Sequence, residues 1–287
     1  MKTTVIYHRS DFDGIFCREI ANKFLGETAT YHGMEYGDPL PDIEGVETLY
    51  IMDFSVPEFM NHPGLIWIDH HKSAIEKFGP KAGYQIDGVA ACRLAWQWFA
   101  KDHTDVVVQF LGLPSKQDFI DRKVNESLAV QLAGEYDVWD KRNPDAELFQ
   151  HGLRSQQINF GTLLSSEDSS DYIADLLFAG KAIQYFQTKQ NESVIKDLGF
   201  TFQWEGLTFL ACNAARYNSF LFTAGLKPEH DACFGFKWTG KDWSISLYHA
   251  SGKEHIDISL IAVKHGGGGH KGACGFRTNK LPFPVMD

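Results

Sequence analysis

The sequence has little positive charge. Lysine and arginine together number 27, against 37 aspartates and glutamates, and the formal net charge of the 287 residues is −10 at pH 7. Tight binding along a nucleic acid depends on neutralising many phosphates, so this balance argues against a protein that binds long duplexes or coats long single strands. An anionic substrate would need local positive charge here, and bound metal ions are one source of it.

The sequence also has few cysteines and no long apolar run. The five cysteines are odd in number, widely scattered and without a CxxC pair, which argues against a disulfide framework and a cysteine-rich zinc site. We therefore expect buried, reduced thiols in a cytoplasmic protein. No apolar stretch reaches the length of a membrane span, and the N-terminus MKTTVIYH has no signal-peptide core, so no membrane partner is expected.

What the sequence does have is three apolar, strand-like runs that each end on a potential metal ligand. TVIYH ends at His8, TLYIMD ends at Asp53, and LIWID leads into His70 and His71. Residues 13–25 follow the first run with apolar residues at helical spacing, so a strand–helix–strand unit is expected. Such crossovers are right-handed and make the strands parallel, which gathers their carboxyl ends along one edge of a sheet. The three runs therefore predict one site.

The pattern of apolar and polar residues along the chain predicts an α/β protein with two domains. Residues 89–100 and 116–140 are helical in pattern and would cover the parallel sheet of a first domain, residues 1–155. Residues 156–199 predict a helical connector. From residue 200 to 287 the pattern changes to short strands separated by turns, which predicts a second, smaller α/β domain.

The ligand types at the strand ends indicate two metal ions. Carboxylates and imidazoles without thiolate suit manganese, magnesium or iron better than structural zinc. The number of acids is that of a two-ion site, in which a shared carboxylate usually bridges the ions and the pair promotes displacement at phosphorus. Asp53 on the middle run is the natural bridge.

Four blocks of the sequence together resemble the DHH phosphoesterase superfamily. They are HRSDFDG at residues 8–14, Asp53 in YIMDFS, the triplet Asp69-His70-His71, and Asp137 in GEYDVWD. The resemblance implies two divalent ions, Mn²⁺ with Mg²⁺ as the alternative, and these ligands: His8, Asp11, Asp13, Asp53, His70 and Asp137. One ion would take His8, Asp11 and Asp53, and the other the remaining three with Asp53 shared. Asp140, one helical turn after Asp137, competes for the place of the fourth acid.

The same resemblance implies catalytic roles for Asp53, His71 and Asp69. His71 would contact the phosphate or donate a proton, and Asp69 would orient the imidazoles.

A glycine run near the C-terminus, VKHGGGGHKGACGF, requires positive φ or close backbone approach, because four glycines are unfavourable inside a regular element. It is not a P-loop, since Gly-Lys-Ser/Thr is absent. It resembles the GGGGH motif of the type 1 DHH-associated domain, which implies that it binds the phosphate and sugar of the substrate. The implied substrate-binding residues are His71, Gly267, Gly268, Gly269, His270 and Arg216.

These features predict a metal-dependent phosphodiesterase that hydrolyses short single-stranded RNA or linear dinucleotides to 5′-mononucleotides. The acidic net charge favours a small substrate. Three alternatives stay open: a phosphatase acting on polyphosphate or pyrophosphate, a cyclic nucleotide or cyclic dinucleotide phosphodiesterase, and a catalytically silent nucleotide-binding module.

Overall fold

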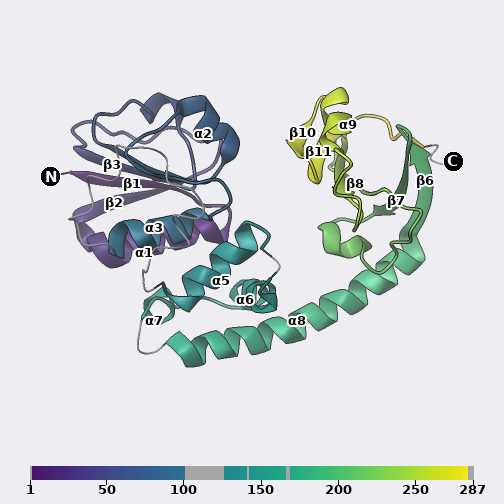
Figure 1. Cartoon of the computed structure of the whole chain (residues 1–287), viewed down its shortest axis with the longest axis horizontal. Coiled ribbons are helices and arrows are strands. Elements are labelled where there is room, and N and C mark those ends of the chain that lie inside the picture. The colour runs from purple at the N-terminus through teal and green to yellow at the C-terminus, as the bar shows by residue number, and fades with distance from the viewer. Residues whose placement is uncertain (1, 101–125, 141, 166–168, 284–287) are drawn as a thin grey trace. The chain divides into compact units, whose positions relative to one another are not determined.

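The computed structural model describes residues 2–100, 126–140, 142–165 and 169–283, and the chain divides into two compact units, Met1–Ile183 and Gln184–Asp287 (Figure 1). Each unit is built on one sheet. The helix predicted over residues 116–140 lies partly outside the described residues, and its described part contains α5 (Leu128–Asp137). The fold is α/β, as the sequence predicts.

The first unit contains a five-stranded sheet of order β2-β1-β3-β4-β5, in which every pairing is parallel. Its strands are β1 (Thr3–His8), β2 (Ala29–Met34), β3 (Thr48–Met52), β4 (Leu65–Asp69) and β5 (Gly83–Gln85). The three apolar runs become β1, β3 and β4, adjacent at the centre of the sheet. Near-continuous apolar sequence suits this place because such strands are buried on both faces.

Helices cover both faces of this sheet (Figure 1). On one face α1 (Phe12–Leu25), α3 (Ala91–Ala100) and α5 share a core around Phe16. On the other, α2 (Lys72–Phe78) and the segment after β3, which includes the short helix η2 (Pro57–Phe59), pack around Trp67. Phe16 and Trp67 are fully buried, and each such burial contributes about 1.5–3 kcal/mol. The short helix η1 (Gly26–Thr28) links α1 to β2.

Three further helices follow α5: α6 (Pro144–Ser155), α7 (Phe160–Leu163) and the 30-residue α8 (Ser169–Leu198). The start of α8 belongs to the first unit, because Ile173 and Leu176 are buried in the same core as α1. A Cβ atom on Gly152 would lie 2.2 Å from the carbonyl oxygen of Leu176, so α6 and α8 pack backbone against backbone. Ile195, near the other end of α8, is buried in the second unit. The division between the units therefore falls within α8, inside the segment predicted as a connector.

The second unit contains a six-stranded sheet of order β10-β11-β9-β8-β7-β6. Its elements are β6 (Gly199–Trp204), β7 (Leu207–Asn213), η4 (Ser219–Phe222), β8 (Ala232–Trp238), β9 (Trp243–His249), α9 (Ser259–Lys264), β10 (Gly268–His270) and β11 (Ala273–Thr278). All its pairings are antiparallel except the parallel pair of β7 and β8. One face packs on α9 and the other on η4 and the end of α8.

All five cysteines are free and buried. No helix in the described part of the chain combines the length and apolar character of a membrane span.

Candidate metal centre

The predicted ligands meet at the carboxyl edge of the parallel sheet. The chain leaves β1 through α1 to reach β2 on one side, and β3 lies on the other side of β1. Such a switch point leaves a crevice beyond the strand ends, where open α/β sheets bind ligands. His8 ends β1, Asp53 follows β3, and Asp69 ends β4, directly before His70. The convergence predicted from the three runs is confirmed.

The first group of side chains consists of His8, Asp11 and Asp53, whose ligand atoms lie within 4.8 Å of one another. His8 Nδ1 is 3.0 Å from Asp11 Oδ2 and 3.6 Å from Asp53 Oδ2. Asp11 is also the N-cap of α1, because its Oδ1 accepts a hydrogen bond of 3.0 Å from the Gly14 N–H. Its Oδ2 is thereby directed at His8.

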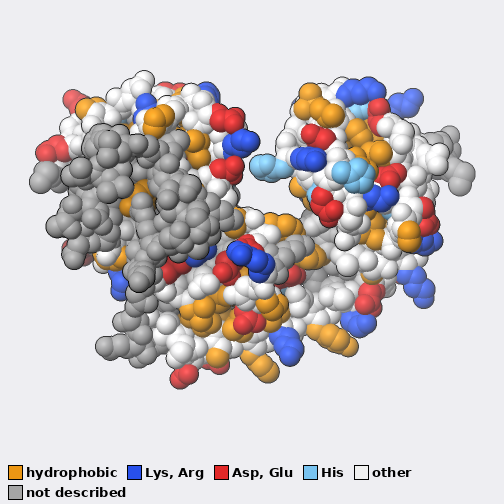
Figure 2. All heavy atoms as spheres, in the orientation of Figure 1, with side chains coloured by type: hydrophobic (Ala, Val, Ile, Leu, Met, Phe, Trp, Pro, Cys, Tyr) orange, Lys and Arg blue, Asp and Glu red, His pale blue; other side chains and the backbone are white. Residues whose placement is uncertain are grey.

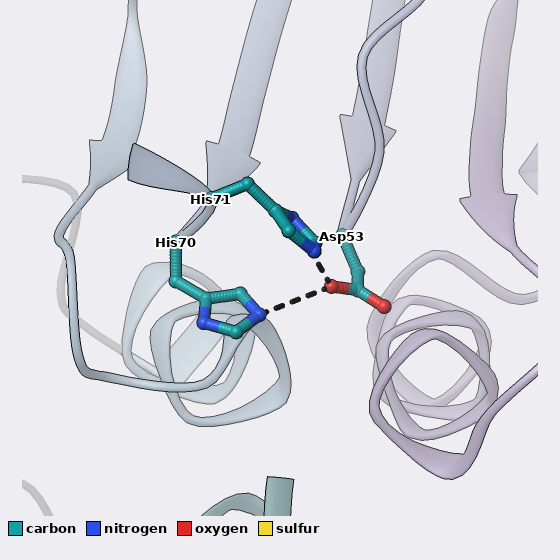
Figure 3. A group of neighbouring side chains, drawn as sticks. All are labelled: Asp53, His70 and His71. Atoms are coloured by element: carbon teal, nitrogen blue, oxygen red, sulfur yellow. Dashed lines mark ion pairs between the residues drawn. The ribbon is translucent and has the colours of Figure 1, made fainter. Parts of the chain in front are cut away.

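The second group consists of Asp13, His70 and Asp137. His70 Nε2 lies 3.5 Å from Asp13 Oδ2, 3.3 Å from Asp137 Oδ2 and 3.4 Å from Asp53 Oδ1. Asp53 therefore faces both groups, with Oδ2 toward His8 and Oδ1 toward His70 and His71 (Figure 3). This is the arrangement that a bridging carboxylate requires.

Asp53 holds an unusual backbone conformation. Its φ is 55°, in the left-handed region that few residues other than glycine adopt. Two hydrogen bonds to β4 and its neighbourhood fix this conformation: the Asp53 N–H donates to the Ile68 carbonyl at 2.9 Å, and Trp67 Nε1 donates to the Phe54 carbonyl at 2.8 Å. Backbone strain of this kind concentrates at functional sites. The side chain is held in place, and the residue is 3% exposed.

Asp13 is positioned by a contact that the sequence did not reveal. Its Oδ2 accepts a hydrogen bond of 2.8 Å from the Ala91 N–H, and its Oδ1 accepts one of 2.7 Å from the Cys92 N–H. Both donors belong to the first turn of α3, where free N–H groups and the helix dipole favour a negative charge. α3 therefore fixes the rotamer of Asp13, whose residue is 2% exposed.

Asp69 holds the His71 ring and the backbone of His70 rather than joining either group. Its Oδ1 accepts hydrogen bonds from the His70 N–H at 2.7 Å and the His71 N–H at 3.1 Å, and it lies 2.7 Å from His71 Nδ1. His71 Nδ1 therefore carries the proton toward Asp69, which leaves Nε2 available. The Asp69 contact raises the pKa of His71. Asp69 Oδ2 is buried and has no hydrogen-bond partner among the described residues.

The acids and imidazoles shift one another's protonation. The carboxylates of Asp11 and Asp53 raise the pKa of His8 to about 10. Burial lowers the pKa of His70, but three neighbouring carboxylates outweigh it and raise the value to about 10. Burial, assisted by a neighbouring carboxylate, raises the pKa of Asp13 and of Asp137 to about 7 each. So many acids in one buried place repel one another, and cations relieve that repulsion.

The donor set fits two divalent cations. It offers carboxylate oxygens and imidazole nitrogens without a thiolate, which suits Mn²⁺ or Mg²⁺. His8 Nδ1 is buried close to two carboxylates and makes no hydrogen bond with the described residues. Buried polar atoms normally have partners, and a metal ion would be one. The alternative acid, Asp140, is in neither group and pairs with Arg142 Nε at 2.8 Å.

The second half of the glycine run lies in a strand, whereas Gly266 and Gly267 precede it. Gly268–His270 form β10, paired with β11, and Gly266 and Gly269 have φ values of 79° and 136°. A Cβ on Gly267 would lie 2.0 Å from the Gly275 carbonyl oxygen, whereas one on Gly268 would meet no described atom within 4 Å. The expected positive φ and close approach are both confirmed.

Arg216 is exposed in the segment after β7, and its neighbour Tyr217 lies over Gly235 of β8. Directly paired residues point to the same face of a sheet. The register runs from Gly235 through Ser246 and Gly275 to Gly268, so Tyr217 and Gly268 share one face. His270 is exposed on this face.

No protein-family model matches the chain, and no curated protein matches it. Solved structures that match nearly its whole length include a pGpG-specific phosphodiesterase, PggH, from Vibrio cholerae, with 14% identity, TM-score 0.53, and coverage of 97% of this chain and 94% of that one. The DHH domain of a protein described as belonging to a family of ribosomal proteins has 12% identity, TM-score 0.51, and coverage of 97% and 83%.

A third match is RecJ in complex with Mn²⁺ from Thermus thermophilus, with 12% identity and TM-score 0.50. It covers 96% of this chain, which spans about half of that protein (49%). At these identities the comparisons speak to the fold.

Proposed function

We propose that this chain, which has the fold of DHH-domain proteins, is a metal-dependent phosphodiesterase. It would hydrolyse short RNA or linear dinucleotides to 5′-mononucleotides. The observation that carries the proposal is the convergence of four sequence blocks into two ligand groups, with Asp53 facing His8 of the first and His70 of the second. The first group would hold one divalent ion and the second group the other.

Two ions bound in these groups would supply Lewis acidity toward the phosphodiester and an activated water nucleophile. The protein's own residues would position them. Asp53 faces both ligand groups from a fixed backbone, α3 holds Asp13, and Asp11 is held by the start of α1. Such preorganisation keeps the ligands from having to rearrange during the reaction.

His71 would act on the substrate itself. Its ring is 41% exposed, and the hydrogen bond from Nδ1 to Asp69 directs Nε2 away from that acid. Because Asp69 raises the pKa of His71, the ring can carry a proton near neutral pH and deliver it to the departing oxygen. Asp69 would thus support catalysis by orienting His71 and the backbone of His70.

The second unit would bind the rest of the substrate. Gly268, Gly269 and His270 would offer backbone groups at the edge of the sheet and an exposed imidazole, whereas the Gly267 N–H already donates to the Ala262 carbonyl at 2.8 Å. Arg216, next to Tyr217, would add a cation for a phosphate. The similarity to a pGpG-specific phosphodiesterase supports a short nucleotidic substrate, and the similarity to manganese-bound RecJ supports Mn²⁺.

Product analysis tests the proposal. The protein is incubated with Mn²⁺ and, separately, with 5′-phosphorylated RNAs from two to about twenty nucleotides, with cyclic mono- and dinucleotides, and with polyphosphate. Release of 5′-mononucleotides, fastest from the shortest RNAs, is the expected result. The Asp53→Asn variant serves as the control for contaminating nucleases.

Orthophosphate from polyphosphate, with RNA left intact, would overturn the proposed substrate while keeping the metal chemistry. Cleavage of cyclic dinucleotides alone would replace the linear substrate with a cyclic one. Metal binding without turnover of any of these compounds would indicate a silent binding module.

A further inference from the structure

An exposed aromatic ring stands beside the first ligand group. Tyr36, which follows β2, is 68% exposed, and its ring centroid lies 4.5 Å from that of Phe54 and 6.5 Å from that of His8. Phe54 follows the candidate bridging residue in the chain and stacks on the His8 ring at 5.7 Å with an interplanar angle of 11°. The three rings form a continuous aromatic surface that begins at a candidate metal ligand and ends in solvent.

The turn that carries Tyr36 is fixed to the same part of the chain as His8. Asp38 Oδ2 accepts a hydrogen bond of 2.8 Å from the Glu35 N–H and one of 2.7 Å from Arg9 Nη1. Gly37, with φ of 96°, allows the tight reversal. Because Arg9 directly follows His8 in the chain, the ring is presented in a defined position next to the candidate metal centre.

The proposed catalytic chemistry, which uses acids, imidazoles and metal ions, does not require the Tyr36 ring. The hydrogen-bonding neighbour of the Tyr36 hydroxyl is Ser55 rather than a candidate ligand, and the residue is 68% exposed. An exposed aromatic face next to a phosphate-binding centre suits a nucleobase, because base–aromatic stacking tolerates any base. Polyphosphate has no group that would use such a face.

We propose that Tyr36 is a stacking platform for the nucleobase of the nucleotide whose phosphate lies at the metal centre. This inference rests on the proposed function and specifies its substrate class. The first unit would recognise a nucleobase, with little discrimination between bases, in addition to the contacts made by the glycine run. Tyr36 is thus a specificity residue, and its ring matters rather than its hydroxyl.

The test compares 5′-phosphorylated diadenylate with two analogues, each lacking one adenine. Wild-type protein with Mn²⁺ is expected to prefer diadenylate over one of the analogues by about tenfold in kcat/KM. Tyr36→Ala should lose that preference by losing activity on diadenylate, with no further loss on that analogue. Tyr36→Phe, which keeps the ring, should retain the preference.

A matched control comes from α8, along which hydrophobic side chains project into solvent (Figure 2). Tyr185 on this helix is also 68% exposed, and Tyr185→Ala should behave as wild type. Mn²⁺ binding, counted by electron paramagnetic resonance, should be unchanged in Tyr36→Ala, which separates loss of stacking from damage to the metal centre.

The outcomes are distinguishable. A wild-type protein that does not cleave diadenylate overturns the proposed function and this inference with it. Cleavage by wild type with an unchanged preference in Tyr36→Ala overturns this inference alone. Equal losses in Tyr36→Phe and Tyr36→Ala would transfer the role to the hydroxyl, and an equal loss on polyphosphate would show that no base is involved; either result contradicts stacking.

Discussion

The side chain of Asp53 faces both groups of candidate ligands, and its backbone occupies the left-handed region. Asparagine tolerates this conformation better than most residues, so Asp53→Asn removes the charge with little change in backbone preference. We expect Mn²⁺ affinity to fall by more than the roughly 10–100-fold that loss of an outer-shell partner costs, and turnover to disappear. Metal titration and the product assay measure the two effects, and circular dichroism should show an intact fold.

Asp140→Asn is the matched control for that experiment. Asp140 lies three residues after Asp137, beyond the end of α5, and outside both ligand groups. Its substitution should leave metal binding close to wild type. A loss as large as that of Asp53→Asn would mean that the fourth acid has been assigned to the wrong residue.

Neighbouring glycines in the glycine run should respond differently to alanine. A Cβ on Gly267 would lie 2.0 Å from a backbone oxygen that cannot move without disturbing β11, so Gly267→Ala should lower stability by about 1–3 kcal/mol. A Cβ on Gly268 would meet no described atom within 4 Å. Gly268→Ala should therefore keep its thermal midpoint within about 2 °C of wild type, yet raise KM for dinucleotides by obstructing the substrate.

Thermal unfolding and steady-state kinetics on the two variants check this contrast. If Gly268→Ala has wild-type KM, the glycine run does not approach the substrate at that position, and its sequence is explained by packing at Gly267 and Gly269 alone.

At the scale of elements, the sequence predicted the central strands and the ends that carry ligands. The apolar runs of β1, β3 and β4 are long enough to be recognised, and parallel pairing follows from their crossovers. β2 and β5 were not predicted, because ATYHGM has little apolar character and GYQ is only three residues long. The short strands predicted from residue 200 onward include β6 through β9.

The sequence could not predict the contact between Asp13 and the start of α3. The residues that meet are 78 and 79 positions apart, and no local pattern marks Ala91 or Cys92 as donors to a carboxylate. For the same reason the aromatic surface of Tyr36, Phe54 and His8 was missed, since it joins the end of β1 to the segments that follow β2 and β3. Contacts of this kind arise from tertiary packing, not from periodicity.

A buried histidine should make the second unit sensitive to acid. His230 is 1% exposed, accepts a hydrogen bond of 3.0 Å from the Lys227 N–H at Nδ1, and has Nε2 2.9 Å from Thr201 Oγ1 on β6. Nδ1 is thus occupied as an acceptor, so the ring must be neutral. Burial lowers the pKa of His230 below 6.5.

The linkage between protonation and folding gives the direction of this pH dependence. Below about pH 6.5, His230 binds a proton in the unfolded chain but not in the folded one. The free energy of unfolding therefore falls as pH decreases, by at most about 1.4 kcal/mol per pH unit. Urea unfolding between pH 7.5 and 5 should show a shallower pH dependence for His230→Gln than for wild type, both with chelator present. Parallel curves would mean that the folded protein accommodates the charged ring.

At the scale of the whole molecule, the candidate metal centre lies in the first unit and the glycine run in the second. Metal binding and substrate binding should therefore be separable. His270→Ala should raise KM for dinucleotides, with a smaller effect on a minimal aryl phosphodiester that does not need the second unit. Mn²⁺ affinity should be unchanged. An equal loss on both substrates would instead assign His270 to the chemistry or to folding.

Metal binding should also be coupled to proton release, because the net acidic molecule holds protons where the ions would bind. His8 and His70, each with a pKa of about 10, are protonated at neutral pH in the metal-free protein. Asp13 and Asp137, with pKa values of about 7, are partly protonated as well. A divalent ion must displace these protons, since its ligands are neutral imidazole and carboxylate.

Mn²⁺ affinity should consequently rise from pH 6 to pH 9. Calorimetric titration at pH 7 in buffers of different ionisation enthalpy measures the released protons directly, because the observed heat changes in proportion to them. We expect release of more than one proton per protein molecule, and less release from Asp53→Asn, which binds less metal. A heat independent of the buffer would mean that no proton is released. His8 and His70 would then already be neutral in the metal-free protein, which contradicts their raised pKa values.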